Sequence, residues 1–126
     1  MRLFFAIITI ALSSALGFGQ VAEFSFEAPV FKSPKINEGK QIEHYFVFTN
    51  SGKAPLIISN YEVACSCTKV FFPNYPIAPG KTDSIRVTFD SNGKYYQQDR
   101  AIILSSNAKK KETTLRLKVY VIPKED

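Results

Sequence analysis

The chain has 126 residues, of which 16 are Lys or Arg and 11 are Asp or Glu, and its formal net charge is +5. A chain of this length has room for one domain with one modest core, and its two cysteines and one histidine fall short of the four ligands that a structural zinc site requires. The densest positive cluster, Lys109 to Lys111, has no aromatic residues interleaved with it, which favours a solvated turn over a nucleic-acid-binding surface.

Residues 1–19 have the pattern of a secretory signal peptide. Arg2 supplies a short positive region, and the apolar segment from Leu3 to Leu16 is followed by small residues at Gly17 and Gly19, as signal peptidase requires. The apolar segment is shorter than the roughly 20 residues that span a bilayer. We therefore expect cleavage before Gln20, export to the periplasm or the extracellular medium, and no stable membrane insertion after cleavage.

The remaining sequence, residues 20–126, alternates apolar and polar side chains with a period of two, which is typical of β-strands. A first strand is expected at 22–27, and a second at 43–49 ends at the turn sequence Asn50-Ser51-Gly52. Further strands are expected at 55–61, 68–72, 84–89, 101–104 and 113–121. Turn residues separate them, and no window of ten or more residues has a helical pattern. The sequence therefore predicts one all-β domain, an immunoglobulin-like sandwich of about seven antiparallel strands.

Five short motifs occur along these strands and the turns between them. They are Phe46-x-Phe48-x-Asn50-x-Gly52-x-x-Pro55-Leu56-x-Ile58, Cys65-x-Cys67-Thr68, Ile77-x-Pro79-Gly80, Ile85-x-Val87-x-Phe89-Asp90 and Ser106-Asn107. Together they resemble the bacterial domain of unknown function 1573, an exported immunoglobulin-like β-sandwich, over roughly residues 22 to 123. The resemblance implies a fold similar to the major-sperm-protein domains, which serve mainly as protein-interaction modules, and it implies no established activity.

The resemblance has two departures from the family pattern. Ser66 stands where the family usually has a glycine between the two cysteines, and Val119 stands where it often has a glycine in the last strand. The first departure restricts the backbone between the cysteines, because serine tolerates fewer dihedral angles than glycine.

Cys65 and Cys67 are the only cysteines and the main candidates for chemistry. In an extended strand they would lie on one face with Cα atoms roughly 6.5 Å apart and parallel Cβ vectors, which makes a disulfide strained and awkward. Four interpretations stay open. Packing of two small side chains is favoured, and the others are a redox-labile disulfide, a thiolate pair that binds Cu(I) and a bridge to another chain.

No group of residues in the sequence reads as a catalytic constellation. No serine, histidine and acidic residue have the pattern of a catalytic triad, and no glycine-rich phosphate-binding loop lies between a strand and a helix. His44 shares a strand face with Ile42, Phe46 and Phe48, where a packed or hydrogen-bonded histidine is more common than a ligand. We therefore predict that the protein is not an enzyme.

Outward aromatic residues are the candidates for partner binding. If Ile42 and its neighbours face the core, then Tyr45 and Val47 face outward, and the same alternation turns Tyr120 outward in the last strand. Tyr95 and Tyr96 are expected on a loop, where tyrosines often anchor contacts. Edge strands of an open sandwich can also accept a partner's strand. In the alternative arrangement, the segment 22–31 folds across Tyr45 and Val47.

The leading hypothesis is an exported, non-enzymatic module without a cofactor, which binds a protein or a cell-envelope component. The alternative is a periplasmic thiol protein that binds Cu(I) or exchanges a disulfide through Cys65 and Cys67. Copper carriers often supplement thiolates with methionine, and the only methionine, Met1, leaves with the signal peptide, which disfavours Cu(I).

Overall fold

The computed structural model describes residues 20–125, so the predicted signal peptide lies outside the described residues. Within them the protein consists of strands and loops, and no helix is present that is long and apolar enough to cross a membrane. The nine strands are β1 (Phe24–Phe26), β2 (Val30–Lys32), β3 (Ile36–Asn37), β4 (Gln41–Asn50), β5 (Ile58–Glu62), β6 (Thr68–Phe71), β7 (Thr82–Asp90), β8 (Tyr96–Ser106) and β9 (Glu112–Ile122).

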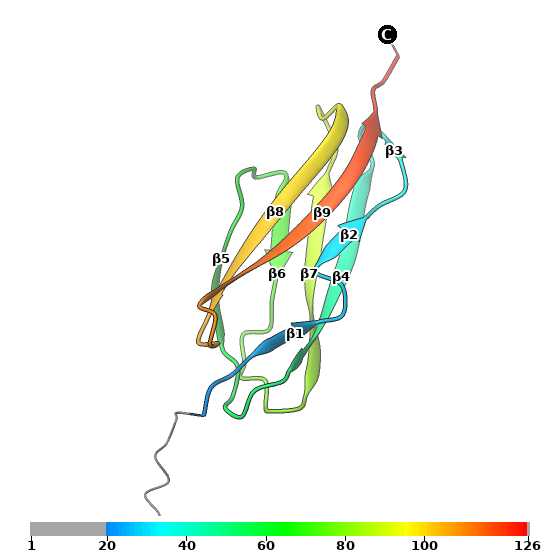
Figure 1. The fold of residues 1–126 in the computed structure, drawn as a ribbon. Coiled ribbons are helices and arrows are strands. Elements are labelled where there is room, and N and C mark those ends of the chain that lie inside the picture. The colour runs from blue at the N-terminus through cyan, green and yellow to red at the C-terminus, as the bar shows by residue number, and fades with distance from the viewer. Residues whose placement is uncertain (1–19, 126) are drawn as a thin grey trace, which may run out of the picture.

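The strands form two sheets that pack face to face (Figure 1). One sheet has the order β1-β4-β7-β6, and the other has the order β2-β9-β8-β5 with β3 also paired to β9. The alternation that predicted the strands also fills the core, because the inward residues of β7 (Ile85, Val87 and Phe89) are fully buried. The prediction of an all-β, two-sheet sandwich is confirmed.

Two of the nine strands, β2 and β3, were not predicted, and they also change the strand pairing. Both pair in parallel with β9, so the sandwich is not purely antiparallel. Strands of three and two residues are too short to show a period of two, and Pro34 interrupts the segment between them. Between β1 and β2 the chain changes sheets, because β1 pairs with β4 in the first sheet and β2 pairs with β9 in the second.

Asn50 is buried at the end of β4 and holds the following turn in place. Its Nδ2 donates to the carbonyl oxygens of Ala54 at 2.8 Å and Ile77 at 2.9 Å. Its Oδ1 accepts hydrogen bonds from the N–H groups of Gly52 at 3.0 Å and Glu23 at 3.3 Å. One side chain therefore ties together the turn, the loop before β7 and the segment that leads into β1.

Candidate functional site

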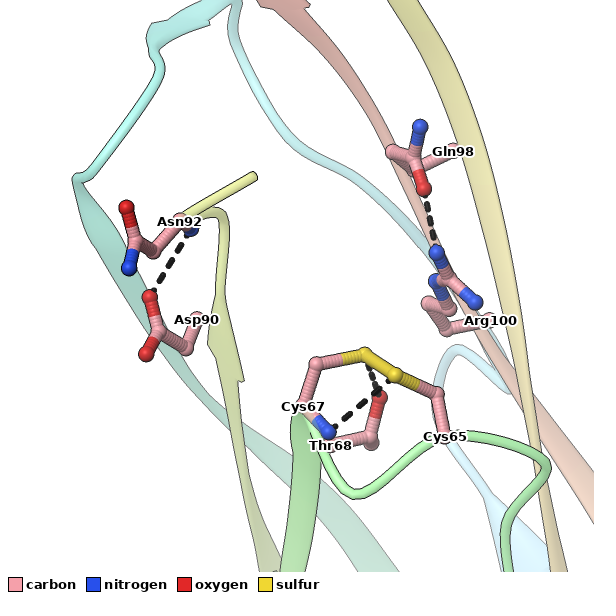
Figure 2. Close-up of a disulfide and its surroundings, with 7 residues drawn as sticks. All are labelled: Cys65, Cys67, Thr68, Asp90, Asn92, Gln98 and Arg100. Carbon is pink, nitrogen blue, oxygen red and sulfur yellow. Dashed lines mark hydrogen bonds between the residues drawn. A yellow bond between two sulfur atoms is a disulfide. The ribbon is translucent and has the colours of Figure 1, made fainter. Parts of the chain in front are cut away.

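Cys65 and Cys67 lie in the loop between β5 and β6, and a disulfide joins them (Figure 2). The N–H of Thr68 donates to the carbonyl oxygen of Cys65 at 3.1 Å, which closes a four-residue turn. We call residues 65–68 the cysteine turn. The favoured interpretation of two free thiols packed on a strand face is wrong. The turn brings the two Cα atoms to 5.1 Å, closer than the spacing that an extended strand imposes.

The two sulfur atoms have different surroundings. The backbone N–H of Cys67 donates to the Sγ of Cys65 at 3.2 Å, whereas the Sγ of Cys67 lies 3.8 Å from the Oγ1 of Thr68. Both cysteines are half-buried, and Cys67 packs against the hydrophobic core. Thr68 is buried at the start of β6 and anchors the turn to the first sheet.

The disulfide lies between two shallow hollows. The lysine hollow has a volume of about 360 Å³, and its lining includes both cysteines, Lys69, Lys94 and Asp90. The arginine hollow has a volume of about 320 Å³, and its lining includes Cys65, Val63, Asp99 and Arg100. Figure 2 shows the same division, with Asp90 on the Cys67 side of the disulfide and Arg100 on the Cys65 side. Only Cys65 borders both hollows.

Arg100 is a charged residue on the inner side of β8. It stands opposite Leu117 of β9 and in phase with the buried Ile102, so its side chain enters the space between the sheets. Its guanidinium carbon lies 5.5 Å from the centre of the Phe89 ring, and its NH2 group donates to the Oε1 of Gln98. Its Nε is buried without a hydrogen-bond partner. A buried donor of this kind needs an explanation, because such groups are rare in folded proteins.

Sequence reasoning missed Arg100, although one signal was available. The predicted strand covers 101–104 and therefore begins one residue after Arg100, whereas β8 extends from Tyr96 to Ser106. Extending the alternation of Leu104 and Ile102 by one step places Arg100 on the inward face.

The predicted partner-binding residues lie on the outer faces of two different sheets. Tyr45 is 52% exposed on β4, and Val47 lies beside it and is half-buried. The segment 22–31 does not cover Tyr45: Glu27 donates to the carbonyl oxygen of Val47 at 3.2 Å, along the edge of β4, and the segment then crosses to β9.

Tyr45 belongs to a row of side chains on the outer face of the first sheet. It stands opposite Arg86 of β7, which in turn stands opposite Phe71 of β6. The guanidinium of Arg86 lies 3.9 Å from the centre of the Phe71 ring and forms an ion pair with Glu43 at 3.3 Å. Phe71 is 44% exposed. We call Tyr45, Arg86 and Phe71 the aromatic row; the last two were not singled out from the sequence.

The other predicted tyrosines gather near the start of β8, on the second sheet. The rings of Tyr96 and Tyr120 lie 6.2 Å apart, and the Nζ of Lys35 lies 5.5 Å from the centre of the Tyr120 ring. Tyr95 is exposed in the loop before β8, as predicted, whereas Tyr96, which was also expected on that loop, is the first residue of β8. Tyr96 has a φ of 64°, a left-handed conformation that is strained for a residue with a bulky side chain. These tyrosines and the aromatic row are therefore separate surfaces.

His44 packs between aromatic rings of both sheets. Its ring stacks on Phe31 with the ring centres 3.7 Å apart, and it meets the edge of Phe46 at 4.6 Å. Burial lowers the pKa of His44 below its usual 6.5. Within residues 20–125, no three side chains of His, Cys, Asp or Glu gather as a metal-binding group. The Cu(I) alternative requires two thiolates, which become available only when the disulfide is reduced.

The comparison with protein families gives one match. A family model described as "Protein of unknown function (DUF1573)" matches residues 24–121. No protein curated for its function matches the chain in sequence.

Several solved structures share the fold at low sequence identity. A Porphyromonas gingivalis W83 protein of unknown function superposes with a TM-score of 0.71 at 14% identity, over 84% of this chain and 50% of its own. The human CEP192 PapD-like domain 7 gives 0.63 at 10% identity, over 83% of this chain and 89% of its own. The Escherichia coli chaperone DraB gives 0.55 at 13% identity, over 82% of this chain and 56% of its own. The chain thus spans half the length of the Porphyromonas protein, and the shared feature is the PapD-like, immunoglobulin-like sandwich.

Proposed function

The chain belongs to the family of proteins of unknown function DUF1573, and we propose that it is an exported, non-enzymatic module that binds a protein partner. The proposed site is the free edge of β4 together with the aromatic row. The partner contributes an extended segment that adds to the first sheet as a further strand. The observation that carries this proposal is the position of Tyr45, which belongs to both the free edge and the aromatic row.

The edge of β4 is open over most of its length. On one side β7 pairs with β4 from Gln41 to Thr49, but on the other side β1 pairs only with Phe48–Asn50. Among residues 20–125, no strand pairs with that edge over Gln41–Phe46. An open edge of this length presents unpaired backbone groups that a partner strand can use.

The direction of the backbone groups of β4 can be read from its hydrogen bonds. The carbonyl oxygen of Val47 accepts from Glu27 on the β1 side, whereas the N–H of Asn50 donates to Lys81 on the β7 side. Because backbone groups alternate between the two edges of a strand, the N–H and C=O of Tyr45 and Glu43 face the open edge. Their peptide groups would therefore form the ladder with an added strand.

The aromatic row supplies the side-chain contacts beside this edge. Tyrosine and arginine are enriched among the residues that dominate binding energy. Arg86 is held between Phe71 and Glu43, so little of its conformational freedom remains to be lost on binding. The partner segment that fits this surface places an apolar side chain on Tyr45 and a carboxylate near Arg86.

Two further observations support the proposal. The signal-peptide pattern of residues 1–19 supports export to the periplasm or the extracellular medium. The fold is shared with DraB, which is a chaperone and so acts on other proteins, and this supports a protein partner over a small-molecule substrate. Neither observation identifies the partner.

The test is site-specific photo-crosslinking of the exported protein in its native host. A photoreactive benzoylphenylalanine at position 45 is expected to give one discrete protein adduct, whereas the same probe at position 120, on the other sheet, gives none. A matched pair of variants at Glu43 then distinguishes strand addition from contact through side chains alone.

Glu43→Pro removes an N–H that faces the open edge and leaves the β4–β7 ladder intact, as edge strands tolerate. Glu43→Ala removes the ion pair with Arg86 but keeps that N–H. We expect the adduct to fall at least about tenfold in Glu43→Pro and to persist in Glu43→Ala, with both variants folded by circular dichroism. An adduct that survives Glu43→Pro, or one that forms only from position 120, would refute the proposed site.

A further inference from the structure

We propose that the cysteine turn is a thiol–disulfide exchange site that accepts two electrons from a dithiol of another exported protein. Cys67 is the sulfur that the incoming thiolate attacks, and Cys65 is the sulfur that leaves. The site lies in the loop between β5 and β6 and is independent of the aromatic row. Three features of the turn support this assignment: the hydrogen bonds to sulfur, the position of Arg100 and the charge of the lysine hollow.

Cys65 has the surroundings of a good leaving group. The backbone N–H of Cys67 already donates to its Sγ at 3.2 Å, and this donor remains in place when the sulfur becomes a thiolate. Hydrogen bonds to a charged group favour the charged form, so this contact stabilises the departing thiolate. A thiol with a lower pKa leaves faster in disulfide exchange.

Arg100 adds positive charge on the same side. It borders the arginine hollow together with Cys65, and its Nε is buried without a partner in the disulfide form. Two carboxylates, those of Asp99 and Glu62, also border this hollow. The carboxylate of Asp99 pairs with Arg116 at 3.2 Å and with Lys118 at 3.9 Å, and Glu62 is exposed at the end of β5. Release of a thiolate from Cys65 gives the guanidinium of Arg100, whose Nε is buried, a counter-charge nearby. This accounts for an arginine held inside the sandwich without full pairing.

Cys67 is reached from the opposite side of the disulfide. It borders the lysine hollow, where Lys69 and Lys94 outnumber the single carboxylate, Asp90. The carboxylate of Asp90 also accepts a hydrogen bond from the N–H of Asn92 at 2.9 Å. The net positive charge of the hollow attracts an anionic thiolate, and attack from this side displaces the other sulfur into the arginine hollow.

The exchange balances in two steps. In the first, a partner thiolate bonds to the Sγ of Cys67, the bond between the two cysteines breaks, and Cys65 leaves as a thiolate. In the second, the other thiolate of the partner attacks the partner sulfur of this mixed disulfide and releases Cys67. The partner dithiol is oxidised to a disulfide, and the cysteine turn is reduced to two thiols by two electrons and two protons.

The attacked sulfur can be identified with glutathione as the probe thiol. The oxidised protein is mixed with glutathione, quenched in acid at short times, alkylated and mapped by tandem mass spectrometry. We expect glutathione on Cys67 and the alkyl group on Cys65, in at least about fivefold excess over the reverse. Equal labelling, preferential labelling of Cys65, or no mixed disulfide in the folded protein would overturn the proposal.

The role of Arg100 is tested with two variants and a matched control. Arg100→Gln is expected to slow the reaction with glutathione about threefold, because the departing thiolate loses a positive charge that borders the same hollow, whereas Arg100→Lys keeps the wild-type rate. Lys111→Gln removes a positive charge that is exposed in the turn between β8 and β9, away from the disulfide hollows, and leaves the rate unchanged. An Arg100→Gln variant that folds and reacts at the wild-type rate would overturn this role.

A second measurement does not depend on any variant. In the reduced wild-type protein, the alkylation rates of the two cysteines are followed as a function of pH by mass spectrometry. We expect the midpoint for Cys65 to lie below that for Cys67, because the N–H of Cys67 and the guanidinium of Arg100 favour the Cys65 thiolate. The reverse order would contradict the assignment of Cys65 as the leaving group.

Discussion

Replacement of Asn50 by alanine should strongly destabilise the protein, because this buried side chain makes four hydrogen bonds. It donates to the carbonyl oxygens of Ala54 and Ile77 and accepts from the N–H groups of Gly52 and Glu23. A hydrogen bond contributes about 0.5–1.5 kcal/mol net, so the loss of four predicts a decrease of about 2–6 kcal/mol in the free energy of unfolding. A domain of this size is stable by only about 5–15 kcal/mol in total.

Urea unfolding followed by circular dichroism measures this loss. Asn92→Ala is the matched control: Asn92 is exposed in the turn after β7, so its replacement should change stability by less than about 0.5 kcal/mol. Asn50→Asp should also destabilise at neutral pH, since a carboxylate can accept from the two N–H groups but cannot donate to the two carbonyls. A loss below about 1 kcal/mol in Asn50→Ala would show that the four hydrogen bonds of Asn50 do not form as described.

Three further predictions concern other residues. Gly52→Ala should prevent stable folding, because an added Cβ would lie 2.2 Å from the carbonyl oxygen of Val21, and soluble yield and thermal unfolding report this. The wild-type protein should lose stability as the pH falls below about 6.5, because burial lowers the pKa of His44 in the folded state and the unfolded chain takes up the proton first. Urea midpoints at pH 7.5 and 5.5 should show that His44→Gln lacks this part of the decline. Tyr45→Asp should change the free energy of unfolding by less than about 1 kcal/mol, since this side chain is 52% exposed; a larger loss would place Tyr45 in the core.

The strands with regular alternation were predictable because one face of each is buried. The predicted segment 84–89 corresponds to β7, and 113–121 corresponds to β9, with boundaries that differ by one or two residues. The order of the motifs also predicted the family correctly. In these cases, the pattern of side chains records a local property, which is burial on alternate residues.

The properties that were missed depend on contacts between distant segments. The cysteines were assigned strand geometry because Thr68 and its successors form β6, and nothing local shows that the strand begins only after the turn. The aromatic row arises from the register between strands, which sets Phe71 and Tyr45 on either side of Arg86. The alternation of apolar and polar residues predicts which face of the sheet a side chain lies on. It does not predict which residue stands opposite on the next strand, because that depends on the register between the strands.

Residue-resolved amide hydrogen exchange tests the central claim, strand addition at β4, most directly. In the isolated protein, the amides of Glu43 and Tyr45, which face the open edge, should exchange much faster than those of His44 and Phe46, which face β7. In the complex with the crosslinked partner, the amides of Glu43 and Tyr45 should become protected while those of His44 and Phe46 stay protected. Protection of Glu43 and Tyr45 in the isolated protein, or fast exchange of both in the complex, would contradict the account.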